Sequence, residues 1–217
     1  MRLELDGVAI GDEPTPSLPT LDALLTDRAP TVVAVGTERG PVLASLLAGG
    51  RMRPDRGTVR LDGAPDAAAL RRAVALVDTP VVAEPPAPVR VATLVAEELR
   101  FAGRPNGRTA ITDLLDDLGI GAWRRAPIAD LPPTDRIRLL LTLAAARPGV
   151  RALVLTSPER HGGPSAEWLG LARGFTEAGT PVLVIGGHAL DPVLRATGVA
   201  GAVAWPLPGP PAPRKPS

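Results

Sequence analysis

Several residue types are absent or nearly absent from this chain of 217 residues. It contains no cysteine, no glutamine and no tyrosine, and its one lysine, Lys215, is the third residue from the end. The lack of cysteine excludes disulfides, thiolate metal sites and cysteine catalysis. No stretch approaches the roughly 20 unbroken apolar residues that a membrane-spanning helix needs. Chemistry that requires a glutamine, or a lysine well inside the chain, is excluded as well.

The residues that are present are typical of a soluble globular protein with nearly balanced charge. Hydrophobic residues make up 45% of the chain and charged residues 22%, and the net charge is +1. We therefore expect no nucleic-acid partner. The first residues, MRLELDG, alternate charged and apolar side chains and lack the apolar stretch of a signal peptide. These features predict a cytoplasmic protein without direct membrane insertion, for which any membrane role depends on a partner.

Apolar runs rich in β-branched residues, together with one alternating segment, predict the strands of an α/β fold. Four runs are typical of a mainly parallel sheet, and two segments are typical of a smaller antiparallel portion. The parallel strands are predicted at 31–35, 74–77, 152–155 and 182–185, and the antiparallel strands at 3–10 and 58–61. We expect the third parallel strand to lie beside the first or close to it.

Helical patterns dominate the middle of the chain, where apolar residues recur at helical spacing in LVAEELRFAG, AITDLLDDLGIGAW and DRIRLLLTLAAAR. A shorter helix, PVLASLLA, begins with proline and is followed by two glycines. This order predicts one domain over 1–205, with a core formed by 1–79 and 150–205 and a helical subdomain at about 80–149. Residues 206–217 are too rich in proline to pack, so we expect a disordered tail.

These segments, in this order, resemble the nucleotide-binding domain of ATP-binding-cassette (ABC) transporters over nearly the whole chain. The most specific stretch is LLAGGRMRPDRGTVRLDG, which is similar to the segment after that family's phosphate loop. VRVATLVAEELRFAG is similar to the start of the family's helical subdomain, LLDDLGIGAWRRAPIADL to the approach to its signature motif, and RIRLLLTLAAARPGVRALVL to the signature helix and the strand after it. The resemblance implies a P-loop NTPase-like fold: an ABC-type ATPase core with a mixed sheet and an α-helical subdomain.

The resemblance also places a phosphate loop, GxxGxGK[ST], where this chain has GTERGPVLASLLAG. A working loop supplies backbone N–H groups and a lysine to the phosphates and a hydroxyl to Mg²⁺. Here Gly40 falls at the lysine position, Pro41 removes an N–H donor, and Glu38 brings a negative charge. Arg39 is either a substitute cation or a solvated turn residue. The vestigial phosphate loop consists of Gly36, Thr37, Glu38, Arg39 and Gly40.

Two further motifs of the family have lost their chemical groups. The glutamine that senses the γ-phosphate is replaced by the sequence Asp78, Thr79 and Pro80. The family's Asp for Mg²⁺ and Glu for the attacking water correspond to Thr156 and Ser157, with Pro158 next. Neither hydroxyl holds a divalent cation as a carboxylate does, and neither is a general base at neutral pH. The resemblance therefore implies no catalytic residue and no metal ligand.

The signature motif LSGGQ, which acts on the ATP of an opposing subunit, is also lost. It corresponds to Leu131, Pro132, Pro133, Thr134 and Asp135. Two prolines replace groups that must donate backbone hydrogen bonds to an anion. We expect Thr134 to cap a helix that starts at Asp135.

The remaining family positions are degenerate too. The motif whose aspartate contacts the opposing subunit corresponds to Gly162, Gly163 and Pro164, and the switch histidine region to Gly186, Gly187 and His188. His188 is either a displaced switch histidine or a loop residue, and His161 is expected at the surface. Residues 12–30, where an adenine-stacking aromatic would lie, contain none. We expect Trp123, Trp168 and Trp205 to be packing residues.

The leading hypothesis is a non-catalytic ABC-type subunit associated with a membrane transporter or with a competent cassette partner. It would be cytoplasmic, or peripheral on the inner face of the cell membrane. We expect no enzyme activity, no cofactor, and weak or absent ATP binding. Partner contacts are expected at 79–95 and on the helix after Leu131, and Val91→Asp should weaken them if Val91 is exposed.

Two alternatives remain open. One is a weakly active ABC transporter ATPase subunit that uses substitutes such as Arg39 and couples ATP binding to transport. The other is a dinucleotide- or small-ligand-binding regulatory module, because VVAVGTERG also reads as strand, turn and helix. That module would use Asp62 as its acidic residue, but the chain lacks GxGxxG. Binding assays with ATP and NAD separate these two alternatives.

Overall fold

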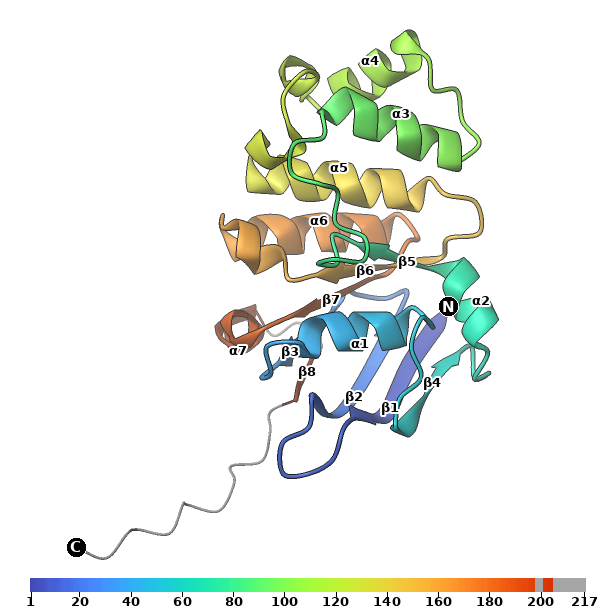
Figure 1. Ribbon diagram of the computed structural model, residues 1–217, viewed down its shortest axis with the longest axis vertical. Coiled ribbons are helices and arrows are strands. Elements are labelled where there is room, and N and C mark those ends of the chain that lie inside the picture. The colour runs from blue at the N-terminus through green and yellow to red at the C-terminus, as the bar shows by residue number, and fades with distance from the viewer. Residues whose placement is uncertain (198–200, 205–217) are drawn as a thin grey trace, which may run out of the picture.

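Two sheets and the helices around them form an α/β structure in the computed structural model of this chain, which describes residues 1–197 and 201–204 (Figure 1). The strands are β1 Arg2–Ile10, β2 Leu18–Thr26, β3 Thr31–Val35, β4 Arg56–Leu61, β5 Val74–Val77, β6 Ala152–Thr156, β7 Val182–Gly186 and β8 Gly201–Ala204. The α-helices are α1 Gly40–Ala48, α2 Ala67–Ala73, α3 Val91–Phe101, α4 Arg108–Asp117, α5 Pro133–Ala145, α6 Ser165–Glu177 and α7 Asp191–Thr197. Short 3-10 helices are η1 Gly121–Trp123, η2 Ile128–Asp130, η3 Pro158–His161 and η4 His188–Leu190.

The larger sheet is parallel, with the strand order β5-β6-β7-β3-β8. Every residue of β3, β5, β6 and β7 is buried, as expected for a parallel sheet covered on both faces. All four predicted parallel strands are confirmed. Only β7 separates β6 from β3, so the predicted closeness of these two strands is confirmed as well.

The smaller sheet is antiparallel, with the order β2-β1-β4. The two predicted strands, at 3–10 and 58–61, are β1 and β4. Strand β2 was not predicted, because the prolines in and before it are typical of a turn, although buried Leu18, Leu21 and Leu25 mark its inner face. Strand β8, which is four residues long and is defined by its pairing with β3, was not predicted either.

The two faces of the parallel sheet carry two separate hydrophobic clusters. Alternate strand residues such as Val32, Leu153 and Val184 pack with α3, α5 and α6, whereas the intervening residues pack with α1 and the antiparallel sheet. Figure 1 shows α5 and α6 on one side of the sheet and α1 on the other, with α3 and α4 beyond α5. The helices predicted within 80–149 are therefore α3, α4 and α5, and α5 also contacts β5 and β6. The division into core and helical subdomain remains a prediction.

The tail predicted at 206–217 lies outside the described residues, as does Trp205. Trp168 is buried on α6, and Trp123 packs against the same cluster, so the packing role of these two residues is confirmed. Of the helices within 1–197, none has both the length and the apolar character required to cross a membrane.

Candidate functional site

The carboxyl ends of β3, β5, β6 and β7 meet at one edge of the parallel sheet, where ligands bind in open α/β folds. The segments that follow these strands contain the vestigial phosphate loop and the other degenerate motif positions. Hydrogen bonds join several of these segments to one another, and they decide what the edge can do chemically.

The vestigial phosphate loop forms a closed turn between β3 and α1. The N–H of Gly36 donates to the carbonyl of Ala204 (2.9 Å), and the N–H of Gly40 donates to the carbonyl of Thr37 (3.1 Å). The Thr37 hydroxyl donates to the carbonyl of Ser17 (2.6 Å). Pro41, in the first turn of α1, has no N–H. The N–H groups of Gly36 and Gly40 are therefore used within the protein, and position 41 has none to offer an anion.

Gly40 is packed too tightly to carry the side chain that the family has at this position. A Cβ atom added here would lie 2.3 Å from Val35 Cγ1 and 2.5 Å from Thr37 Oγ1. A lysine at position 40 would therefore require the loop to move. Glu38 and Arg39 are exposed, and within 1–197 and 201–204 neither side chain forms a hydrogen bond or ion pair. Arg39 remains the basic side chain of this loop.

Three buried hydroxyls fill the space between α1, β6 and the end of β5. Thr79 Oγ1 lies 2.7 Å from Thr156 Oγ1, which lies 2.8 Å from Ser45 Oγ, and Ser45 Oγ donates to the carbonyl of Pro41 (2.8 Å). Because the Ser45 hydrogen is used on Pro41, Thr156 must donate to Ser45 and Thr79 to Thr156. Thr79 and Thr156 stand where the resemblance places the sensor glutamine and the Mg²⁺ aspartate. Both belong to a chain of neutral hydroxyls in which every hydrogen is used in a hydrogen bond.

Breaking this hydroxyl chain should destabilise the protein. Thr156→Val removes the donor to Ser45 and leaves the buried Thr79 hydroxyl without its acceptor. We expect the free energy of unfolding to fall by about 1–3 kcal/mol, and by much less for Thr156→Ser. Urea denaturation measures the free energy of unfolding of both variants. Thr142→Val is the control, because that hydroxyl bonds only to Arg138 within its own helix. Equal effects of Thr156→Val and Thr142→Val would contradict the hydroxyl chain.

Asp78 is the centre of a buried charged cluster at the end of β5. Its carboxylate accepts hydrogen bonds from Arg136 of α5 through Nη2 (2.7 Å) and Nε (3.2 Å). His161 Nε2 lies 2.6 Å from Oδ2, and Arg160 Nη2 lies 3.0 Å from Oδ1 and donates to the Asp78 carbonyl (2.7 Å). The Asp78 side chain is 1% exposed and the Arg136 side chain 6% exposed. The cluster therefore ties three elements together: β5, α5 and η3.

The charges around Asp78 keep its carboxylate ionised. Burial by itself would raise the pKa of Asp78, but the hydrogen bonds from His161 and Arg136 and the charges of Arg136 and Arg160 lower it well below its usual range. Arg160 also contacts Glu84 (2.9 Å). The expectation that His161 is a surface residue is wrong, because the contact of His161 with Asp78 holds the His161 side chain at 20% exposure.

Sequence reasoning missed Arg136, although a signal was available. Arg136, Leu140 and Leu143 recur at helical spacing, so the arginine stands on the buried stripe of α5. A buried arginine needs a carboxylate partner. The sequence could have shown that such a partner exists, but not that it is Asp78.

At the position of the signature motif, the helix start and the role of Thr134 differ from the prediction. α5 begins at Pro133, not Asp135, and the Thr134 hydroxyl donates to the carboxylate of Glu167 on α6 instead of capping the helix. The physical reason is that proline suits the first helical position, which moves the start two residues earlier. The carboxylates of Asp135 and Glu167 stand at this helix start, where they oppose the approach of a phosphate.

Glu159 is a second residue that sequence reasoning missed. It follows Ser157 by two positions in η3, and its Oε1 accepts a hydrogen bond from the N–H of Gly187 (2.9 Å). Oε2 is buried and has no hydrogen-bond partner among the described residues. A Cβ on Gly186 would lie 2.6 Å from Glu159 Oε1, so the glycine is needed for this contact. His188 stands at the start of η4, directly beyond β7.

Within 1–197 and 201–204, no group of three or more His, Asp or Glu side chains is arranged to hold a metal ion. Asp62, the acidic residue of the dinucleotide hypothesis, lies in the turn after β4. It accepts a hydrogen bond from the Arg2 N–H (2.8 Å) and pairs with Arg151 (2.9 Å). Asp62 is therefore engaged within the protein.

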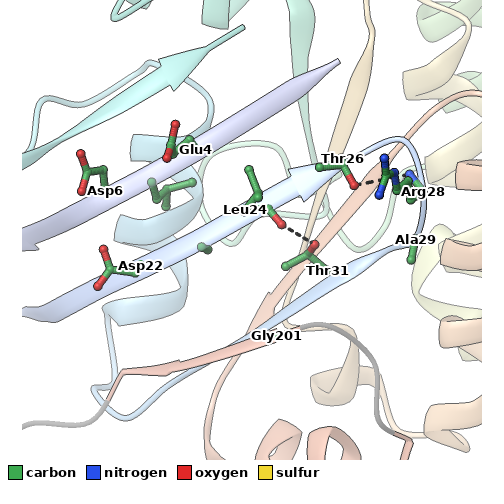
Figure 2. Close-up of a pocket in the computed structure, with 11 residues that line it drawn as sticks. Glu4, Asp6, Asp22, Leu24, Thr26, Arg28, Ala29, Thr31 and Gly201 are labelled. Carbon is green, nitrogen blue, oxygen red and sulfur yellow. Dashed lines mark hydrogen bonds between the residues drawn. The ribbon is translucent and has the colours of Figure 1, made fainter. Parts of the chain in front are cut away.

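A wide depression beside β2 and the start of β8 is shown in Figure 2. Its carboxylates already have partners: Asp6 pairs with Arg60 (2.7 Å), Glu4 with Arg2 (3.2 Å), and Asp22 accepts from the N–H of Gly7 (2.6 Å). None of the predicted site residues lines it. We therefore do not assign the chemistry of the protein to this depression.

A groove of about 400 Å³ lies between segment 82–89, α3 and α5. Apolar side chains of α3 and α5 line it together with Arg51, Val82, Glu84, Glu97 and Arg147. Val82, which lines it, is 46% exposed, and Val81, the residue before Val82, is fully exposed. Val91 does not face this groove, because it is completely buried at the start of α3. The condition for the Val91→Asp test, an exposed Val91, is therefore not met, and that change would disrupt the core rather than probe a surface.

Comparisons with known proteins give a structural match without a sequence match. No protein-family model and no curated protein sequence matches this chain. In contrast, a protein assigned as an ABC transporter ATP-binding protein from Pyrococcus furiosus is similar with a TM-score of 0.66 at 12% identity, covering 94% of this chain and 98% of that one. A nucleotide-free ATP-binding cassette from an ABC transporter gives 0.61 at 13% identity, covering 94% and 88%.

A third similar structure is cbiO1 of Clostridium perfringens, described as part of the ABC transporter complex cbiONQ. Its TM-score is 0.60 at 16% identity, covering 87% of this chain and 79% of cbiO1. At these identities the likeness shows the fold alone. The chain has the P-loop NTPase-like α/β fold of ABC transporter ATP-binding proteins.

Proposed function

We propose that this protein is a non-catalytic ABC-type subunit that associates with a membrane transporter subunit or with a competent cassette partner. The observation that carries the proposal is the edge of the parallel sheet. There the vestigial phosphate loop is a closed turn, and Thr79, Thr156 and Ser45 satisfy one another's hydrogen bonds. An ATP-hydrolysing site needs groups that are free to bind phosphate and Mg²⁺. In support of the proposal, Gly40 and Thr156 stand where the resemblance places the lysine and the Mg²⁺ carboxylate, and the N–H groups of Gly36 and Gly40 are engaged within the protein.

The groove beside α3 and α5 supports a role that depends on association. Val81 has a positive φ of 64°, which is strained for a β-branched residue, and it is fully exposed. Such strain costs stability without burying any apolar surface in this chain. The similar structure cbiO1 is part of a transporter complex, so we propose that a membrane protein covers this rim. The cytoplasmic location, peripheral on the membrane, follows from the same proposal.

The second candidate function is a weakly active ATPase. Its specific support is the Glu159 carboxylate, two residues beyond the position of the family's catalytic glutamate, with Arg39 as a substitute cation. The missing Mg²⁺ carboxylate argues against it. A dinucleotide-binding module has less support, because Asp62 pairs with Arg151 in the turn after β4. We propose no resident cofactor.

The association is tested by a charge placed on the groove rim. We expect the protein to co-purify with an integral membrane protein from native membranes, and Val82→Asp to lower that recovery by about tenfold, which corresponds to about 1.4 kcal/mol. Leu24→Asp is the matched control, because Leu24 is 42% exposed but lies on β2, outside the groove. Recovery with soluble proteins only would favour a free regulatory role over the transporter association.

A further inference from the structure

The connection from β5 to α3 contains a segment that few hydrogen bonds hold in place. Residues 80–86, called the strap from here on, form neither helix nor strand, and three of the seven are prolines, which have no N–H. The N–H groups of Val82 and Ala83 donate to the carbonyl of Thr79 (3.1 and 2.9 Å). Among the described residues, the backbone hydrogen bonds of the strap therefore stay within 79–89. Figure 1 shows this connection passing over α5 and α6 on its way to α3.

Both ends of the strap are fixed to the fold. Directly before it, the buried hydroxyl of Thr79 lies 2.7 Å from Thr156 Oγ1. Shortly after it, the carbonyl of Val89 accepts a hydrogen bond from the N–H of Ile128 (2.7 Å). The middle of the strap lies between these two anchored points, so its attachment depends on side chains.

One ion pair attaches the middle of the strap to another element. Glu84 Oε1 accepts a hydrogen bond from Nη1 of Arg160 in η3 (2.9 Å), and no other hydrogen bond links 80–86 to another element among the described residues. The Glu84 and Arg160 side chains are 35% and 25% exposed. A pair at such a solvated position changes an equilibrium by about fivefold or less. Arg160 also contacts Asp78 (3.0 Å), so the release of Glu84 leaves Arg160 with a carboxylate partner.

The backbone and the apolar contacts of the strap add little to this attachment. Val81 has a φ of 64°, which is strained for a β-branched residue, and its side chain is fully exposed. Val82 is half-exposed, and Ala83 is only partly buried. Pro85 is the buried residue of the strap. The closed position of the strap therefore depends on Pro85 and on the Glu84 pair.

The strap separates two hollows of the protein. Glu84 and Pro85 line the groove of about 400 Å³ beside α3 and α5, and the same two residues line a second hollow of about 240 Å³. Arg136 and His161, which bind Asp78, line the second hollow as well. Pro85 thus forms a partition between two spaces, and it is not enclosed in a close-packed core.

We propose that the strap opens and closes in the folded protein, and that the Glu84–Arg160 pair is the contact that holds it closed. When Glu84 leaves Arg160, residues 80–86 move about their two anchored ends. The two hollows then join into one cavity that reaches His161 and the charged cluster around Asp78. This motion belongs to the chain by itself, so it goes beyond the proposed function and needs no partner.

Amide hydrogen exchange of the purified full chain, followed residue by residue by NMR, tests the opening. Glu84→Gln should speed exchange at Val82 and Ala83 about fivefold, and Glu84→Lys should speed it more, because a like charge then faces Arg160. Sodium chloride should speed exchange in the unmodified protein but not in Glu84→Gln, since salt screens a solvated ion pair. The amide of Val154, in the middle of β6, should exchange at an unchanged rate.

The two histidines of the chain report whether the hollows join. His161 lines the second hollow, whereas His188 lies beyond β7 and does not line it. Diethyl pyrocarbonate modifies histidine, and mass spectrometry measures the modification of each one. Glu84→Gln should raise the rate at His161 relative to His188 by about the same factor as the exchange at Val82.

A matched control separates the strap from a general loss of surface charge pairs. Glu13→Gln removes another exposed ion pair, with Arg56 (4.0 Å), and should leave exchange at Val82 and Ala83 within about twofold of the unmodified protein.

The outcomes decide the proposal. Unchanged exchange at Val82 and Ala83 in both Glu84 variants overturns it. An equal acceleration at Val154 also overturns it, because the whole fold then opens and not the strap. Faster exchange at Val82 without faster modification of His161 overturns the joining of the two hollows. Acceleration confined to the strap, together with the gain at His161, supports the proposal, and none of these results depends on whether a membrane partner exists.

Discussion

Asp78→Ala is expected to lower the free energy of unfolding by about 3–5 kcal/mol. The change leaves Arg136, which is 5% exposed, as a buried charge without its carboxylate. It also releases Arg160 and His161, so that β5, α5 and η3 lose their common contact. The loss arises mainly from the uncompensated charge, not from the removed hydrogen bonds themselves. In a protein of this size it corresponds to a fall in melting temperature of roughly 6–20 °C.

Thermal and urea denaturation measure this loss. Asp130→Ala is the control, because Asp130 is exposed and makes no ion pair among the described residues. It should change the free energy of unfolding by less than about 0.5 kcal/mol. A cost of Asp78→Ala below about 1 kcal/mol would show that the cluster is solvated in solution and does not hold α5 to the sheet.

The same cluster predicts how stability depends on pH. The pKa of Asp78 is lower in the folded protein than in the unfolded chain, where it is about 3.9. The folded state therefore binds its proton less readily, and the stabilisation is complete above the unfolded pKa. It should be lost progressively as the pH falls below about 4, and this part of the acid sensitivity should be missing in Asp78→Ala. Denaturation at a series of pH values measures the free energy of unfolding of the unmodified protein and of Asp78→Ala.

Purified protein is expected to show no Mg²⁺-dependent ATP hydrolysis above background. Loss of one catalytic contact commonly lowers turnover by a factor of about 10² to 10³, and the proposed function implies that several are lost together, although such effects do not simply multiply. The closed turn at Gly36 and Gly40 adds a structural reason, because its N–H groups donate to Ala204 and Thr37. Phosphate would have to displace these two bonds to use those donors.

Phosphate release and thermal shift test this expectation together. A ligand present at 100 times its Kd would stabilise the fold by about 2.7 kcal/mol. Because we expect weak or absent ATP binding, millimolar ATP should leave the melting temperature unchanged. Arg39→Ala and Glu159→Gln should both give the same background as the unmodified protein. Turnover that disappears in either variant would favour the weakly active ATPase.

The sequence by itself determines which residue types the proposed function can draw on. A chain without glutamine cannot supply the sensor residue, and its one lysine, Lys215, is far from the loop at 36–40. Four of the five strands of the parallel sheet were also predictable, because runs of β-branched and other apolar residues are a local feature of the sequence, whereas β8 was not. In the antiparallel sheet, β2 was not predicted, because prolines in and before it indicated a turn and its leucines, at positions 18, 21, 24 and 25, do not alternate.

Only the tertiary structure decides which polar groups meet. Asp78 and Arg136 are 58 residues apart, and Ser45 and Thr156 are 111 residues apart. No local pattern fixes such pairs, because they depend on how α1 and α5 pack on the two faces of the sheet. Burial at the groove was undetermined for the same reason: of two valines in one predicted contact region, Val91 is buried and Val82 is exposed. Helix α3 turns the first into the core, whereas the turn after β5 presents the second to solvent.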